Sequence, residues 1–199
     1  MFSVAATPPW SLWDGKDYKN MSDQDEAKFR MIEYHKWKFK AKIFSPLAPL
    51  TVKRTPVLMT RVEYGFLGSY NKYKKSPFET FYMGGDGMSG YSSTYATETI
   101  GLRGYENGSI AGNGGYNSYG YAYSRLSMEL RYPFLLEPSS TIYGLVFVEA
   151  GNAWRDLKDF NPFQLKRSAG VGVRIFLPMI GMMGIDWAYG FDRPDGYDQ

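Results

Sequence analysis

A two-residue periodicity constrains the fold of this chain more than any other feature of its sequence. Residues 36–43 read Lys-Trp-Lys-Phe-Lys-Ala-Lys-Ile, so lysine occupies every second position. Successive side chains of a β-strand point to opposite sides of a sheet, whereas a helix would spread these lysines around its axis. The segment is therefore predicted to be a strand with one apolar face and one cationic face.

The same alternation recurs along the chain. Five more segments alternate between a face of mainly aliphatic and aromatic side chains and a second face with charged residues, serine or glycine: 57–66, 121–132, 142–151, 168–177 and 183–191. In 142–151 the second face also carries Tyr143 and Phe147 beside Glu149. Residues 2–7 give a weaker signal of the same kind. We therefore expect an all-β, antiparallel fold of about seven strands, several of which approach the ~9–11 residues of a membrane-spanning strand.

Composition favours a membrane barrel over a soluble sandwich. The chain contains 17 Tyr, 13 Phe, 5 Trp and 22 Gly, yet its mean hydropathy is only −0.38. Aromatic girdles, an apolar outer face and a polar lumen produce this combination in outer-membrane barrels. A soluble antiparallel sheet also alternates, so a soluble β-rich binding protein stays as an alternative.

Other function classes find little support in the residue types. The chain has no cysteine and a single histidine, which excludes thiolate sites and histidine clusters for metals. No nucleophile, base and orienting residue can be assembled, so we expect no enzyme and no cofactor. Basic and acidic residues are interspersed at a net charge of +3, which argues against a nucleic-acid partner.

The predicted connections alternate in length. Short or moderate links that contain proline are expected at 45–56, 133–141 and 178–181, and longer polar ones at 13–30, 72–118 and 155–167. Outer-membrane barrels have short periplasmic turns and long extracellular loops. The links near Pro46, Pro133 and Pro178 are therefore expected to face the periplasm.

The longest predicted loop carries the most specific motif. Its two parts are Phe81-Tyr82-Met83-Gly84-Gly85 and, further on, Gly101-Leu102-Arg103-Gly104-Tyr105. In these residues the chain resembles the Omp85 superfamily (bacterial surface antigens), most closely its BamA-like assembly factors. The resemblance continues in order through 127–131, 147–154, 168–173 and 184–190.

The resemblance implies a fold and a function. It implies an integral protein of the cell outer membrane, part of an insertase that assists the folding and insertion of outer-membrane proteins. The implied partners are nascent outer-membrane proteins, outer-membrane lipids and accessory assembly lipoproteins. Another Omp85-type barrel, such as a TamA-like translocation component, is the alternative within the same superfamily.

The resemblance also implies a domain assignment. Residues 1–199 correspond to the C-terminal portion of the β-barrel domain, with no POTRA domains and without the final strand. We therefore expect an open partial barrel with a long loop that folds inward.

A loop lock is the site hypothesis that follows. In the superfamily the loop arginine lies in the barrel lumen, where an unpaired guanidinium would be costly. Glu129 and Glu149 fall on the predicted lumen faces of adjacent strands, and carboxylates can pair with arginine bidentately. The predicted lock comprises Arg103, Gly104, Tyr105, Glu129 and Glu149, and the supporting loop motif comprises Phe81, Tyr82, Gly84, Gly85 and Gly101. The alternative is an exposed Arg103 in a flexible, glycine-rich loop.

Overall fold

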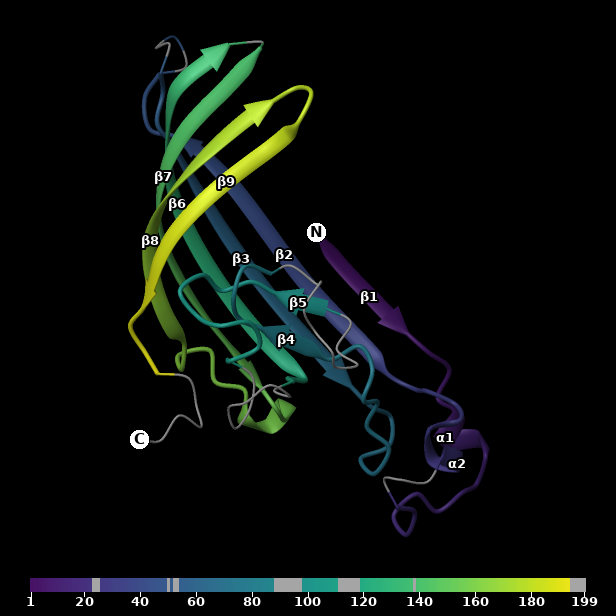
Figure 1. Ribbon diagram of the computed structural model, residues 1–199. Helices are drawn as coiled ribbons and strands as arrows, with labels where there is room; N and C mark the ends of the chain where they lie inside the picture. Colours follow the sequence, from purple (N-terminus) through teal and green to yellow (C-terminus); the bar gives the residue numbers. More distant parts are fainter. Residues whose placement is uncertain are drawn as a thin grey trace.

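One antiparallel sheet dominates the computed structural model, which describes residues 1–22, 26–49, 51, 54–87, 98–110, 119–137 and 139–193. The seven strands lie in the order β1-β2-β3-β6-β7-β8-β9 (Figure 1). Their bounds are β1 Phe2–Ala6, β2 His35–Pro46, β3 Val57–Gly68, β6 Ala122–Glu137, β7 Ser140–Trp154, β8 Lys166–Leu177 and β9 Gly181–Gly190. The expected all-β class is confirmed, and each strand predicted from alternation is present.

The sheet is curved and open. Figure 1 shows the strands bending around a concave face, with β1 at one edge and β9 at the other. Among the described residues these two edges do not pair with each other. The expected open partial barrel is therefore confirmed.

The register fixes what each face carries. Ser127 lies opposite Glu149, and Gly172 lies opposite Asp186, so the polar positions of neighbouring strands share the concave face. The positions between them point to the convex face, where large apolar side chains stay exposed. They include Trp37, Phe39, Met128, Leu130, Val146, Val148, Val171, Ile185 and Trp187. The alternation in the sequence thus becomes a charged inner wall and an apolar outer wall.

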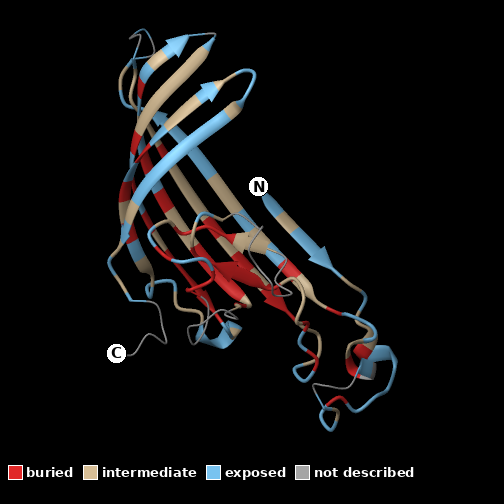
Figure 2. Cartoon of the chain, in the orientation of Figure 1, coloured by how far each residue is buried: buried red, intermediate tan, exposed pale blue. Residues whose placement is uncertain are grey.

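The segment between β3 and β6 folds into the concave side. It forms two short parallel strands, β4 (Phe81–Met83) and β5 (Glu98–Ile100). A buried cluster joins this insert to the sheet and comprises Leu67, Phe81, Met83, Ile100, Leu102, Tyr105, Ile110, Tyr123 and Ala153. Figure 2 shows buried residues concentrated where β4 and β5 face the sheet. The core of the molecule therefore lies between loop and wall, as an inward-folding loop requires.

The two ends of the sheet differ. One end has tight connections, with β6 and β7 separated only by residues 138–139. The expected link 133–141 is therefore wrong at its start: Pro133 lies inside β6, at a register shift between Pro133 and Leu135. Proline lacks a donor for the ladder, and a bulge is where a strand tolerates it.

The other end carries the long connections. They hold two short helices, α1 (Trp10–Trp13) and α2 (Glu26–Phe29), and the 3₁₀ turn η2 (Leu157–Asp159). Over the part of the chain that the structure describes, no helix has the length and apolar character to cross a membrane.

Candidate functional site

Two glycines bring Arg103 against the concave wall. A Cβ on Gly101 would lie 3.0 Å from the carbonyl carbon of Asp86. Gly104 has a φ of +92°, and a Cβ there would lie 2.9 Å from the backbone nitrogen of Gly190 in β9. Only glycine permits such close backbone approach together with a positive φ. The arginine between them is therefore held near the sheet by the loop backbone.

The Arg103 guanidinium lies among three carboxylates from three strands. Its Nη2 is 2.6 Å from Glu129 Oε1 and 2.7 Å from Glu149 Oε1. Its Nη1 is 3.3 Å from Asp186 Oδ2 in β9. The group also covers the ring of Phe147, 3.5 Å from the centroid, where a cation is attracted to the π face. The structure thus brings Arg103 together with Glu129 and Glu149, the two residues that the sequence places on the lumen faces of adjacent strands.

Each of these carboxylates also binds another arginine. Arg125 donates to Glu149 over 2.9 Å, Arg131 to Glu129 over 2.6 Å and Arg174 to Asp186 over 2.6 Å. We call this set the arginine network: Arg103, Arg125, Arg131, Arg174, Glu129, Glu149 and Asp186. Since carboxylates and guanidiniums alternate in space, the network connects β6, β7, β8 and β9 through one loop residue.

Burial makes the arginine network electrostatically strong. The Arg103 side chain is 13% exposed and the Glu149 side chain 0%. Burial by itself would lower the pKa of the Arg103 guanidinium, but hydrogen bonds and charges from Glu149 and Glu129 outweigh it and raise that pKa above its ordinary value. Arg103 therefore stays charged, and loss of one partner would leave an uncompensated buried charge.

Tyr105 connects the loop to the last strands. Its hydroxyl donates to the carbonyl oxygen of Arg167 over 2.6 Å and accepts from the backbone N–H of Asp192 over 3.3 Å. Burial raises the pKa of this phenol, which therefore remains a donor at neutral pH. Gly104 and Tyr105 thus contact β8, β9 and the segment that follows β9, while Arg103 reaches β6, β7 and β9.

The other part of the motif builds the loop itself. Phe81 packs edge-on against Tyr123 of β6, with ring centroids 4.6 Å apart. Tyr82 donates from its hydroxyl to the carbonyl of Asn107 over 3.2 Å. Gly84 and Gly85 both have positive φ, and Gly84 N–H donates to the carbonyl of Ile100 over 2.9 Å. These residues support the insert that carries Arg103.

A second charged cluster, unanticipated from the sequence, fastens the loop to β2. Glu98 of β5 lies 2.9 Å from Lys36, 3.0 Å from Lys38 and 3.7 Å from Lys40. Burial alone would raise the pKa of Glu98, but the hydrogen bonds and charges of Lys36 and Lys38 outweigh it and hold that pKa below its ordinary value. Glu98 sits in a loop without periodicity, so no sequence signal marked it.

The missed members of the arginine network did leave a signal. Arg125, Arg131, Arg174 and Asp186 all occupy polar positions of predicted strands, on the same face as Glu129 and Glu149. The two-residue periodicity therefore predicts that these residues lie on the concave face, where the structure has them. Which of them would meet Arg103 depended on the curvature of the sheet. Within the described ranges, no three His, Cys, Asp or Glu side chains come together as a metal site.

Comparison with known proteins supports this architecture. A family profile described as the Omp85 superfamily domain matches residues 27–199. Among solved structures, BamA from Haemophilus ducreyi lacking POTRA domains 1–3 is similar, with a TM-score of 0.58 and 21% sequence identity. The match covers 82% of this chain and 32% of that one, so this chain spans about a third of that structure. No curated protein sequence matches.

Proposed function

This chain belongs to the Omp85 superfamily, and we propose that it forms part of an outer-membrane β-barrel that assists the insertion and folding of outer-membrane proteins. In this proposal residues 1–199 are a C-terminal portion of the barrel domain, and the role is non-enzymatic. Its partners would be nascent outer-membrane proteins, surrounding lipids and accessory lipoproteins.

The uncovered convex face supports a membrane location. Large apolar side chains on this face are exposed on β2, β6, β7, β8 and β9, for example Phe39, Val148 and Trp187. Soluble monomers rarely expose contiguous apolar patches beyond a few hundred Å². Lipid would cover this face, while the charged concave face would line an aqueous lumen.

The position of Arg103 carries the proposal. Arg103, a single loop residue, binds carboxylates from β6, β7 and β9. The position of the loop therefore restricts how far these strands can move apart, and so restricts the curvature of this part of the sheet. A wall of fixed curvature provides a rigid support beside edges that have to open and pair with client strands. We therefore assign Arg103, Gly104, Tyr105, Glu129 and Glu149 the role of a loop lock.

The decisive experiment compares two arginine variants in proteoliposomes that contain the purified protein. Arg103→Ala is expected to reduce the yield of folded client barrels, whereas Arg167→Ala is expected to leave it unchanged. Arg167 is a matched control because it also pairs with a carboxylate, Asp192, but its side chain is 68% exposed. Arg103→Lys keeps the positive charge but loses the planar guanidinium, which can donate to several carboxylates at once. The yield of folded client barrels with this variant should therefore lie between those of wild type and Arg103→Ala.

Heat resistance of the barrel is measured in parallel with client assembly. Wild-type assembly and wild-type heat resistance in Arg103→Ala would overturn the lock. Reduced heat resistance with unchanged assembly per folded molecule would make the network purely structural. A folded wild-type protein that assembles no client would favour a translocation component instead.

A further inference from the structure

A cavity of about 560 Å³ lies on the concave face beside the arginine network. Seven lysines and arginines line it against four carboxylates. Glu149 and Glu98, which are not in the lining, pair with Arg103, Arg125 and Lys40, so a smaller excess of positive charge is left on the wall. Two of the lining carboxylates, Glu129 and Asp186, are each bound by two arginines. The excess positive charge therefore comes from lysines and arginines that are not paired with these carboxylates.

Lys42 and Arg61 carry that excess. They lie directly opposite each other on β2 and β3 and line the same cavity. Among the residues that the structure describes, neither forms an ion pair with a carboxylate, whereas the neighbouring Lys40 reaches Glu98. Like charges directly opposite on adjacent strands destabilise a sheet. An anion between them would turn this repulsion into attraction.

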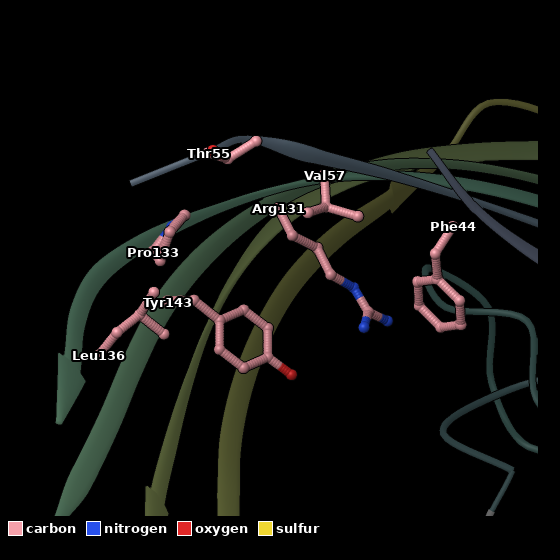
Figure 3. Close-up of a pocket in the computed structure, with 7 residues that line it drawn as sticks. All are labelled: Phe44, Thr55, Val57, Arg131, Pro133, Leu136 and Tyr143. Atoms are coloured by element: carbon pink, nitrogen blue, oxygen red, sulfur yellow. The ribbon is translucent and has the colours of Figure 1, made fainter. Parts of the chain in front are cut away.

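An apolar pocket adjoins this cavity. It has a volume of about 330 Å³, and its lining is mostly apolar, including Phe44, Val57 and Pro133 (Figure 3). Arg131 and Tyr143 line both spaces, so the two adjoin at these side chains. Figure 3 shows the Arg131 guanidinium between Phe44 and Tyr143. Its central carbon is 5.7 Å from the ring centroid of Phe44 and 5.8 Å from that of Tyr143.

Arg131 can serve a ligand without leaving the network. Its Nε and Nη2 both donate to Glu129 Oε2, over 3.0 and 2.6 Å. Among the described residues, its Nη1 has no acceptor, so this donor group is available at the border of the two spaces. Together with Lys42 and Arg61 it offers three cationic groups to one anion.

We propose that the two adjoining spaces form a binding site for a small organic anion with one compact apolar group. The anionic group, a phosphate, sulfonate or carboxylate, would lie among Lys42, Arg61 and Arg131. The apolar group, an aromatic ring or a short alkyl chain, would lie in the pocket against Val57, Pro133 and Leu136. The pocket volume falls at the lower end of the ~300–1,000 Å³ typical of small-molecule sites, which fits one ring rather than a long chain.

The test uses 4-fluorophenyl phosphate and fluorine NMR on the full chain folded in an uncharged detergent. Wild type is expected to broaden and shift the fluorine signal in a saturable way. The double variant Lys42→Gln/Arg61→Gln should bind at least about tenfold more weakly, because two charge-assisted contacts are lost. Lys158→Gln, at an exposed lysine of η2, is the matched control and should bind like wild type.

Folding of the double variant is checked independently of binding. Removal of two facing cations relieves repulsion, so its heat resistance without ligand should equal or exceed that of wild type. Unchanged affinity in this variant would overturn the site. Equal binding of the neutral 4-fluorobenzyl alcohol would also overturn it, since the anion would then contribute nothing. Equal binding of inorganic phosphate would remove the role of the apolar pocket.

Discussion

At the scale of single residues, Glu149 is the most connected member of the lock. It accepts from the backbone N–H of Arg103, from the Arg103 and Arg125 guanidiniums and from the Ser127 hydroxyl. Its side chain is fully buried. A carboxylate in that position depends wholly on protein donors, and in turn neutralises two buried guanidiniums.

Glu149→Gln should therefore destabilise the fold strongly. Loss of the charge leaves Arg103 and Arg125 under-compensated in a buried site, which typically costs about 3–5 kcal/mol. Urea unfolding in detergent micelles, followed by tryptophan fluorescence, gives the free energy of unfolding. Asp192→Asn is the control, since its arginine partner is largely exposed, and it should change stability little. Equal effects of the two substitutions would show that burial of Glu149 contributes nothing.

The backbone at Gly104 can be tested with a second glycine of the same conformation. Gly104 and Gly181 have φ values of +92° and +91°, but an added Cβ meets nothing within 4 Å at Gly181. Gly181→Ala should cost about 1–2 kcal/mol through φ alone. Gly104→Ala should cost clearly more, since its Cβ would collide with Gly190, and should weaken the Arg103 contacts as well. Equal losses of unfolding free energy would argue against close packing of the loop on β9.

At the scale of elements, Glu98 decides whether β5 stays fastened to β2. Its pKa is below the ordinary value in the folded protein because of Lys36 and Lys38. A carboxyl group whose pKa is lower in the folded protein than in the unfolded chain stabilises the fold. This stabilisation is present at pH values above the pKa in the unfolded chain, and it is lost as the pH falls through the pKa in the folded protein. The contribution should therefore be complete at pH 7 and disappear under strongly acidic conditions.

The measurement compares wild type with Glu98→Gln at each pH. Wild type should have the larger free energy of unfolding at pH 7, and the difference should vanish as Glu98 becomes protonated. Comparison at the same pH cancels the titration of the other carboxylates. Glu106→Gln, at an exposed loop position, should show no such pH-dependent difference. A difference that persists at low pH would assign the effect of Glu98 to packing instead of charge.

The elements also show where prediction from the sequence stops. Alternation located the strands and assigned their faces, because period two is a local property of the chain. It placed Glu129 and Glu149 on the wall that Arg103 meets. It could not find the parallel pairing of β4 with β5, since three-residue strands carry no periodicity. Nor could it find Glu98 or the partnership with Asp186, because both depend on how the loop crosses a curved sheet.

At the scale of the whole molecule, the sheet has an apolar outer face, and among the described residues its edge strands β1 and β9 have no strand paired on their outer sides. Every second N–H and C=O group of β9 points toward β8, and the others point away from the sheet. In hydrocarbon each unpaired backbone group costs several kcal/mol. The exposed apolar face and the edge of β9 therefore favour different environments. The apolar face is stabilised in lipid, whereas the edge is destabilised there unless another strand pairs with it.

Amide hydrogen exchange in lipid bilayers tests how this conflict is resolved. If a further strand pairs with β9, whether from the same barrel or from a second copy, its outward amides should be protected as well as its inward ones. Amides of β7, which is paired on both sides, provide the internal standard. Rapid exchange of the outward β9 amides alone, in protein that remains in the bilayer, would mean that the membrane tolerates this edge by thinning or by admitting water. In that case the lock formed by Arg103, and not closure of the barrel, would be what keeps the wall curved.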